Sequence, residues 1–465
     1  MSPAVDSLRN LVPSRSRADP DQPRSKYWID DWRPEDPTFW KETGAAIAKR
    51  NLFYSVTSEH IGFSVWSLWS VIVLFLGPDY GIDPAGKFLL TALPTLAGGL
   101  LRLPYTFAVA TFGGRNWTIV SALLLLIPTV LIGIILVPGV SYITLLIVAT
   151  TAGVGGGNFA SSMTNINAYY PQRLKGWALG VNAGGGNLGV PVVQLVGLLI
   201  LATVGAGAPR LLVVIYIPLI ILAAIGAARN MNNLTHLTNS KRAMREVSKD
   251  RNTWIISLLY IGTFGSFIGF SFAFGQVLQV QFADIFSTPV KAAYLTFIGP
   301  LIGSLVRPVG GSLADRFGGS RVSFVNFVAM ALGAAVVLTA SLLHSLPLYL
   351  IGFVMLFAFS GLGNGSVYKM IPAIFKAKSG TEIINGADPT VSMAKSQRQA
   401  GALIGIAGAI GAFGGVLVNL AFRQSFLATK SADSAYIAFI AFYAVCCVVT
   451  WYVYLRQSPR KLQSV

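Results

Sequence analysis

Long apolar stretches recur along this chain, with short polar segments between them. A run of about 20 apolar residues is what an α-helix needs to cross the hydrocarbon core of a bilayer. Such stretches are found at residues 51–76, 88–110, 117–137, 142–169, 177–204, 211–228, 254–280, 292–313, 322–343, 348–375, 400–421 and 435–455. The pattern therefore predicts an all-α membrane protein with twelve transmembrane helices.

One polar break, at residues 229–252, divides these helices six and six. It predicts an N-terminal segment (1–50), an N-terminal six-helix bundle (51–228), a linker (229–252), a C-terminal six-helix bundle (253–455) and a tail (456–465). The first 27 or so residues are mixed in charge and contain prolines, so we expect them to be disordered.

Lysine and arginine are distributed unequally between the two sides of these helices. The side that holds both termini and the linker carries 27 of them, and the opposite loops carry five. The positive-inside rule places the basic side in the cytoplasm, so both termini are expected there. The net charge of +17 follows from this loop topology, and nucleic-acid binding is not expected.

Composition narrows the class further. Hydrophobic residues make up 54% of the chain and charged residues only 11%, which is too little charge for the surfaces of several soluble domains. Cys446 and Cys447 are adjacent in an apolar stretch, where a disulfide between them is sterically unfavourable and other metal ligands are missing. No metal site and no cofactor is therefore predicted.

Two arginines stand alone inside apolar stretches. Arg102 and Arg307 each lie ten residues before a Phe-Gly-Gly, at residues 112–114 and 317–319. An arginine at the centre of a spanning helix costs about 2.5–3.5 kcal/mol on insertion scales, so it is kept where it faces a cavity or a partner. Matching cations in the two halves predict a duplicated protein that binds an anion.

Glycine-rich helices repeat between the halves as well. Residues 153–158 are echoed by 361–366, and residues 183–189 by 408–415. Glycines in membrane helices allow close packing, and two related halves are expected to rock about a site near the midplane. The glycines to which we assign packing or gating are Gly184, Gly186, Gly411 and Gly414. Packing alone, without gating, explains most of these glycines equally well.

The loop at residues 311–319, which contains Asp315 and Arg316, resembles the cytoplasmic motif of the major facilitator superfamily. Its counterpart in the first half lacks the aspartate. This resemblance implies two pseudo-symmetric six-helix bundles and says nothing of the substrate.

Residues 31–40, 91–102, 158–163 and 263–270 together resemble the NarK-type nitrate/nitrite porters, and the likeness covers the chain from about Trp32 onward. The resemblance implies a carrier of the bacterial cytoplasmic membrane. It also implies a central pocket in which Arg102 and Arg307 clamp nitrate or nitrite. A guanidinium group suits a planar anion because it offers two in-plane N–H donors.

The resemblance implies four more pocket residues. Phe159 and Phe264 would be ring walls for the flat anion, and Asn187 and Tyr260 would be hydrogen-bond donors. Ordinary helix packing is the alternative for the two phenylalanines.

Glu59 and His60 form the only adjacent titratable pair inside an expected span. Glu59 lies about 12 Å deep along its helix, at a depth similar to that of Arg102, so the two side chains could meet. The pair could carry a proton. Alternatively, Glu59 forms a salt bridge that only ties helices together. We interpret Lys369, near the inner end of its helix, as a snorkelling side chain.

The sequence therefore predicts a secondary transporter, not an enzyme, that exchanges nitrate for nitrite by alternating access. Nitrate/proton symport through Glu59 and His60 is the second possibility. A carrier of another small anion, such as formate or a dicarboxylate, and a membrane anion sensor or channel are further alternatives. Its expected partners are small inorganic anions and the lipid bilayer, and we expect a monomer.

Overall fold

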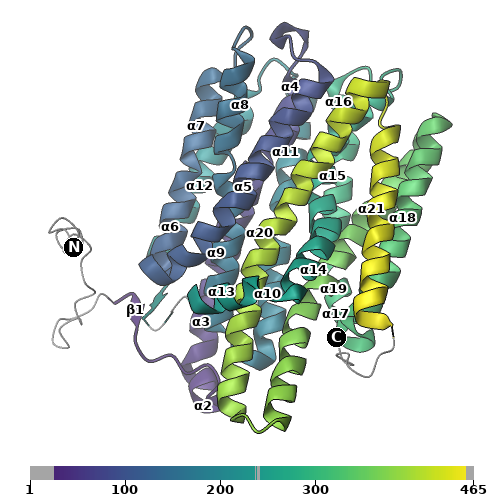
Figure 1. Cartoon of the computed structure of the whole chain (residues 1–465). Helices are drawn as coiled ribbons and strands as arrows, with labels where there is room; N and C mark the ends of the chain where they lie inside the picture. The colour runs from purple at the N-terminus through teal and green to yellow at the C-terminus, as the bar shows by residue number, and fades with distance from the viewer. Residues whose placement is uncertain (1–25, 236, 238–240, 457–465) are drawn as a thin grey trace, which may run out of the picture.

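The computed structural model describes residues 26–235, 237 and 241–456. Within this part of the chain, twelve helical segments are long and apolar enough to cross a membrane (Figure 1). The predicted fold class is confirmed. The N-terminal residues expected to be disordered lie outside the described residues, apart from 26 and 27, as does the tail beyond residue 456.

The first six spans contain several short breaks. At the break between α3 and α4, for example, the hydroxyl group of Ser67 donates to the carbonyl oxygen of Phe63 at 2.7 Å. The helices are α3 (Ala45–Trp66), α4 (Leu68–Phe75), α5 (Pro84–Phe112), α6 (Gly114–Leu124), α7 (Leu126–Ile135), α8 (Tyr142–Thr151), α9 (Val154–Tyr169), α10 (Gln172–Asn187), α11 (Gly189–Thr203) and α12 (Arg210–Asn230).

The second six spans are less interrupted. The first of them contains a π-helical turn, η3 (Ile261–Gly265), between two α-helices. The helices are α14 (Arg251–Tyr260), α15 (Ser266–Gln281), α16 (Pro289–Thr296), α17 (Ile298–Phe317), α18 (Gly319–Leu342), α19 (Leu346–Ile384), α20 (Pro389–Thr429) and α21 (Asp433–Thr450), which continues into η4 (Trp451–Leu455).

Two of these helices are much longer than the sequence pattern predicted. The apolar stretch of α19 ends at residue 375, but the helix continues to Ile384. The apolar stretch of α20 begins at residue 400, but the helix already begins at Pro389. Their extensions are polar and helical, with an ion pair of 2.7 Å between Lys395 and Glu382. A search for apolar residues does not detect this part of a helix, which protrudes below the bundle in Figure 1.

Small elements join the N-terminal segment to the linker. Strand β1 (Trp28–Ile29) pairs in parallel with β2 (Asn233–Leu234), and the short helix α2 (Pro37–Phe39) and the π-helical turn η1 (Trp40–Gly44) lead into α3. The linker also contains α13 (Lys241–Ser248), which packs on α20. We call the end of the bundle that holds β1, α13 and the α19–α20 turn the basal end, and the other the distal end (Figure 1).

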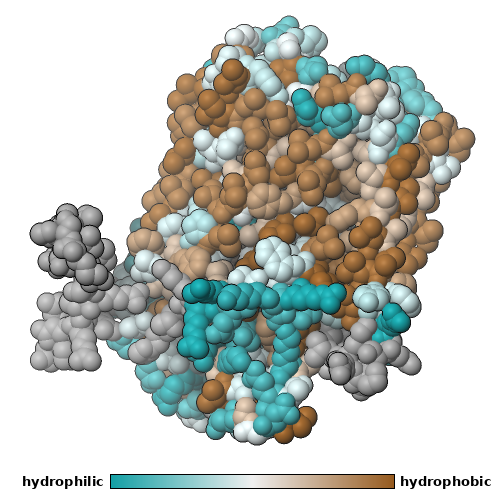
Figure 2. Space-filling model, in the orientation of Figure 1, coloured by the Kyte–Doolittle hydropathy of each residue, from teal (hydrophilic) through white to brown (hydrophobic). Residues whose placement is uncertain are grey.

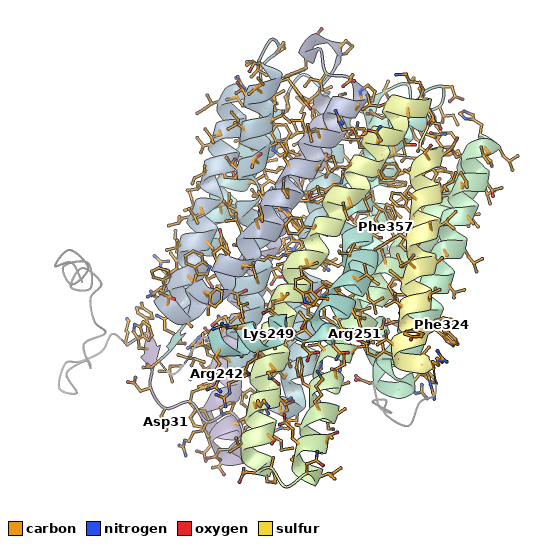
Figure 3. All side chains as sticks on the ribbon, viewed as in Figure 1. Asp31, Arg242, Lys249, Arg251, Phe324 and Phe357 are labelled. Carbon is orange, nitrogen blue, oxygen red and sulfur yellow. The ribbon has the colours of Figure 1, made fainter. Side chains whose placement is uncertain are left out.

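The surface matches a membrane protein. Figure 2 shows a broad hydrophobic belt with hydrophilic residues gathered at the basal end and along the distal rim. Figure 3 places Asp31, Arg242, Lys249 and Arg251 toward the basal end. The belt is the face that lipid would cover.

The two halves contact each other closely at the distal end. The Thr91 hydroxyl group donates to the Asn419 amide oxygen at 2.7 Å, and the ring of Phe88 stacks on that of Phe422 with centroids 5.8 Å apart. These contacts join α5 to α20, which run side by side (Figure 1). The molecule is therefore sealed distally.

Candidate functional site

Matching helix ends position the two arginines. The helices α5 and α17 both end at a glycine in the left-handed region, Gly113 with φ 89° and Gly318 with φ 88°. A residue with a Cβ is strained at such angles, so glycine fixes the ends of these helices. Arg102 and Arg307 therefore occupy the same position in their respective helices.

Arg102 is completely buried and bridges the two halves. Its Nε donates to the carbonyl oxygen of Gly156 on α9 at 3.2 Å, and its Nη1 donates to that of Gly408 on α20 at 2.5 Å. The guanidinium group also lies over the ring of Trp66, 5.6 Å from its centroid. No carboxylate within the described residues forms an ion pair with it.

Arg307 is also buried, with 6% of its surface exposed. Its Nη2 donates to the hydroxyl oxygen of Tyr260 at 3.3 Å, and its guanidinium carbon lies 5.7 Å from the ring centroid of Tyr368. The two phenol rings lie 4.8 Å apart. Arg307 is therefore held by aromatic side chains of its own half.

A stack of aromatic rings lies close to both guanidinium groups. Phe159 and Phe264 stack with centroids 6.0 Å apart, and the Tyr260 ring is nearly parallel to that of Phe264. The guanidinium carbon of Arg102 lies 4.6 and 4.8 Å from the centroids of Phe159 and Phe264, and that of Arg307 lies 5.8 and 6.0 Å away. The structure thus brings together five of the six predicted pocket residues.

Two buried donors at this centre, Nη2 of Arg102 and Nη1 of Arg307, have no partner among the described residues. The side-chain amides of Asn187 and Asn364 are also buried without a partner in the described chain. Asn364 lines the same cavity as Arg307, whereas no contact between described residues brings Asn187, the sixth predicted residue, to the arginines. Leaving a buried donor unpaired costs about 1–3 kcal/mol, and more for a charged group. A small ligand rich in acceptors, and negatively charged, would satisfy these donors.

Glu59 does not meet Arg102 as predicted. Its carboxylate is completely buried, and Oε2 accepts a hydrogen bond of 2.7 Å from the Asn182 amide. Oε1 has no partner in the described chain, and it occupies a space that a Cβ at Gly186 would fill. Both arginines are close enough to interact with the carboxylate electrostatically, without a direct ion pair. The direct partner of the Glu59 carboxylate is therefore Asn182, which the sequence did not mark.

His60 has a different environment from its neighbour. Its Nδ1 lies 3.1 Å from the carbonyl oxygen of Gly185, to which it can only donate. That carbonyl lies near the break between α10 and α11. The contact gives His60 a structural role in holding the break.

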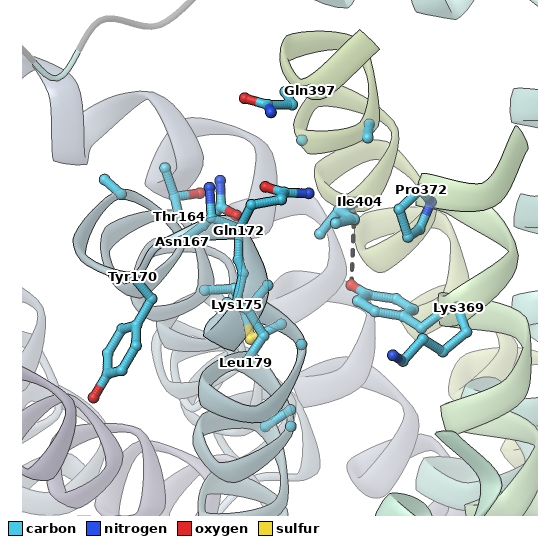
Figure 4. Close-up of a pocket in the computed structure, with 18 of the residues that line it drawn as sticks. Thr164, Asn167, Tyr170, Gln172, Lys175, Leu179, Lys369, Pro372, Gln397 and Ile404 are labelled. Atoms are coloured by element: carbon cyan, nitrogen blue, oxygen red, sulfur yellow. Dashed lines mark hydrogen bonds between the residues drawn. The ribbon is translucent and has the colours of Figure 1, made fainter. Parts of the chain in front are cut away.

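A cavity of about 1080 Å³ opens at the basal end and extends to Arg307, Asn364 and Tyr368. Arg102, by contrast, is fully enclosed. Figure 4 shows residues of α9 and α10 on one wall of this cavity and Lys369 and Pro372 of α19 on the other. The centre can therefore be reached from the basal end only through the side on which Arg307 lies.

The predicted cytoplasmic motif lies at the rim of this cavity. The ammonium group of Lys369 contacts both carboxylate oxygens of Asp315, at 2.8 and 2.9 Å. The ammonium group of Lys369 thus reaches the polar rim, as expected of a snorkelling side chain, and it also pairs with the motif, which the sequence did not predict. Arg316 is exposed and lies over the ring of its neighbour Phe317.

Three of the four selected glycines lie at close contacts. A Cβ at Gly411 would collide with the Tyr260 ring, one at Gly186 with Glu59, and one at Gly414 would lie 2.6 Å from the Cα of Gly265. Around Gly184 nothing lies within 4 Å of an added Cβ, so packing does not require a glycine there.

Sequence reasoning missed Trp66, Asn182, Asn364 and Tyr368. Asn364 interrupts its glycine-rich stretch at the position that Gly156 occupies in the first half, so a comparison of the two repeats could have marked it. Tyr368 and Trp66 carry no such signal, because aromatic residues are common in membrane helices.

The chain resembles known proteins over most of its length. The model of the Major Facilitator Superfamily matches residues 61–387. The nitrate/nitrite transporter NarU of Salmonella typhimurium is 38% identical, and the alignment covers 94% of this chain and 98% of that protein. The probable nitrate/nitrite antiporter NarK2 of Thermus thermophilus is 33% identical, over 93% and 98%.

Solved structures agree with the fold. The xylose transporter XylE from E. coli, in a partially occluded inward-open conformation, aligns with a TM-score of 0.61 over 88% of this chain and 98% of that one. At 14% sequence identity this likeness concerns the fold alone.

Proposed function

Because the chain belongs to the NarK-type nitrate/nitrite porter family of the major facilitator superfamily, and so is a transporter rather than an enzyme, we propose that it exchanges nitrate for nitrite across the bacterial cytoplasmic membrane. Its basal end would face the cytoplasm. The names of its relatives support the substrate. The observation that carries the proposal is the pair of buried arginines, each with an unpaired guanidinium nitrogen, that both lie within about 6 Å of the Phe159 and Phe264 rings.

The chemistry of this centre suits a flat monoanion. Nη2 of Arg102 and Nη1 of Arg307 offer N–H donors from opposite halves, and the rings provide apolar walls. Charge-assisted hydrogen bonds to oxygen are about twice as strong as neutral ones. An oxyanion with acceptors on its edge and an apolar face fits both features.

Exchange follows from the charges. Two guanidinium groups repel each other when no anion lies between them, so drawing the halves together is unfavourable in the empty state. An anion that binds both arginines removes this penalty, and the carrier then changes conformation when loaded. The distal contacts and the basal cavity describe one of the two end states, with the site open to the cytoplasm.

Proteoliposomes test the proposal directly. Labelled nitrate should enter vesicles loaded with nitrite and should enter empty vesicles at least tenfold more slowly, whether or not an inward proton gradient is imposed. Unlabelled nitrite should compete, and formate or a dicarboxylate should not. Equal uptake into loaded and empty vesicles would contradict exchange, and competition by formate alone would point to a different anion.

Glu59 supports a second candidate, nitrate/proton symport. Glu59 is completely buried and close enough to both arginines to interact with their charges, so the empty centre would carry one net positive charge with Glu59 ionised and two with Glu59 protonated. Moving this centre across the membrane is less costly when its net charge is smaller. A proton taken up with the anion would then allow net uptake. His60 is a weaker participant, because its ring is held at Gly185.

The Glu59→Gln variant separates the two candidates. If the carrier is a symporter, gradient-driven uptake into nitrite-free vesicles should fall at least tenfold in Glu59→Gln. Uptake should persist in Glu382→Gln, which removes a partly exposed carboxylate from the basal extension. Gradient-driven uptake that survives in Glu59→Gln would leave Glu59 a structural role.

A further inference from the structure

Four polar side chains form a patch on one wall of the basal cavity. Thr164 and Asn167 come from α9, and Gln172 and Lys175 come from the start of α10 (Figure 4). Each pair has the i, i+3 spacing that places two side chains on one face of a helix. We call these four residues the vestibule patch.

Lys175 is the charged member of the patch. Its side chain is half-buried, and within the described part of the chain its ammonium group has no hydrogen-bond or ion-pair partner. The one carboxylate that interacts with it electrostatically, Glu35, is already engaged, because its Oε1 accepts the backbone N–H of Gln172 at 2.8 Å. A cation in this position has capacity for an anion from solution.

The patch provides more than a single charge. The side-chain amides of Asn167 and Gln172 offer further N–H donors, and neither has a hydrogen-bond partner among the described residues. A small oxyanion accepts hydrogen bonds from several donors at once. The patch therefore has the composition of a weak anion site, open to water on one side.

The surrounding cavity strengthens this effect. Four basic residues line it, Lys175, Arg307, Lys369 and Arg398, against two acidic residues, Glu35 and Asp315. Asp315 is neutralised by Lys369, whose ammonium group comes from the opposite half and lies 3.3 Å from the position of an added Cβ at Gly176. A concave surface of one sign of charge, with low-dielectric walls, raises the local concentration of the opposite ion.

We propose that the vestibule patch is a second binding site for the transported oxyanion, a low-affinity site through which nitrate or nitrite passes between the cytoplasm and the arginine pair. The inference rests on the proposed function. Lys175 lies near the start of the continuous helix α10, at the basal end of the cavity wall. Arg307 lines the same cavity, so the two sites share one water-filled path.

Sided transport measurements test the patch. In inside-out membrane vesicles loaded with nitrite, Lys175→Gln should raise the KM for nitrate about three- to tenfold, as expected for the loss of electrostatic steering. The dependence of this KM on ionic strength should flatten as well. In right-side-out vesicles, where nitrate enters from the distal end, the KM should stay within twofold of the wild-type value.

Matched variants guard against trivial explanations. Lys175→Arg keeps the charge and should behave like the wild type. Lys249→Gln removes an exposed charge from the same end, outside the cavity lining, and should leave both KM values unchanged (Figure 3). Thermal unfolding of the purified variants identifies any that fail to fold, in which case Gln172→Ala replaces Lys175→Gln with a smaller expected rise in KM.

The outcomes separate this inference from the proposed function. If the wild type exchanges nitrate for nitrite and Lys175→Gln keeps a wild-type KM and salt dependence in inside-out vesicles, the second site is refuted. An equal rise in KM from both sides would also refute it, since a site in the vestibule acts on one side only. A wild type that shows no exchange would refute the proposed function instead.

Discussion

Individual side chains at the centre show how burial and chemistry are linked. A guanidinium group taken out of water without a carboxylate partner is stable only if other groups compensate it. Arg102 donates hydrogen bonds to two carbonyl oxygens and lies close to three aromatic rings, and Arg307 donates to the Tyr260 hydroxyl oxygen. One nitrogen of each group is buried without a partner among the described residues, and these are the two nitrogens that we propose bind the anion.

Tyr260→Phe tests this arrangement at a single atom. The change removes the acceptor of Arg307 Nη2 and leaves the ring stack on Phe264 intact. A hydrogen bond to a charged group contributes about 1.5–3 kcal/mol, so we expect the KM for nitrate to rise about tenfold or more. Initial rates in nitrite-loaded proteoliposomes measure it.

Tyr105→Phe is the matched control. The Tyr105 hydroxyl group is buried on α5 and has no partner among the described residues, so its removal should leave the KM unchanged. A KM for Tyr260→Phe that is no higher than for Tyr105→Phe would contradict the role given to Tyr260.

The sequence predicted some residues of the centre and not others for physical reasons. A lone arginine in an apolar stretch is conspicuous because its burial is costly, so Arg102 and Arg307 could be identified from the order of residues alone. Asn182 could not, because an amide carries no charge and its contact with Glu59 depends on how α10 packs against α3. The partner of Lys369 could not be predicted either, since Asp315 is far away in the sequence.

Helix contacts within the second half depend on small residues. Gly414 of α20 lies against the backbone of Gly265 in η3, at a distance that no larger residue permits. The sequence predicted that the glycines pack, but it gave no sign of the π-helical turn or of the break after α10. Both depend on hydrogen bonds between helices that a periodic pattern does not encode.

Gly414→Ala should weaken the packing of α20 on η3. The added methyl group would lie 2.6 Å from a backbone atom that has little freedom to move. Overpacking of this kind typically costs about 1–3 kcal/mol, which thermal unfolding of the purified protein should report as a lower Tm. Gly184→Ala is the control, because the space there is open, and an equal Tm for the two variants would contradict this packing.

An ion pair at the basal end joins the linker to α19. Asp250 pairs with Lys378 and also accepts the backbone N–H of Asn252 at the start of α14. Partial burial raises the pKa of Asp250, but the hydrogen bonds and the charge of Lys378 outweigh it, so the pKa lies below its usual value. A lowered pKa contributes stability above the unfolded-state pKa, and this stability is lost as the pH falls through the folded-state value.

Asp250→Asn keeps the capping oxygen and removes the charge. Its Tm should lie below that of the wild type at pH 6, by an amount that corresponds to about 0.5–1 kcal/mol. The difference should begin to shrink as the pH falls through about 4 and should vanish only below the lowered folded-state pKa, where the wild-type carboxylate is protonated too. A Tm difference that does not depend on pH would contradict the ion pair's role, and Glu382→Gln, at a more exposed pair, should show little effect.

On the proposed function, the whole molecule combines these parts into a carrier with a central site that can be approached from two ends. The arginines come from opposite halves, the distal contacts close one approach, and the basal cavity opens the other. The two-half architecture was predictable from the repeat of helices, arginines and glycines. The open side was not, because a conformation is a balance between contacts at both ends of the bundle.

The central claim is that two guanidinium groups together hold a planar oxyanion during exchange. The measurement that tests it most directly is the initial rate of nitrate entry into nitrite-loaded proteoliposomes for the wild type, Arg102→Lys and Arg307→Lys. Because lysine keeps the charge but loses the planar pair of donors, each variant should fall to about one hundredth of the wild-type rate or less. Substantial exchange in both variants, at correctly folded protein, would contradict the account.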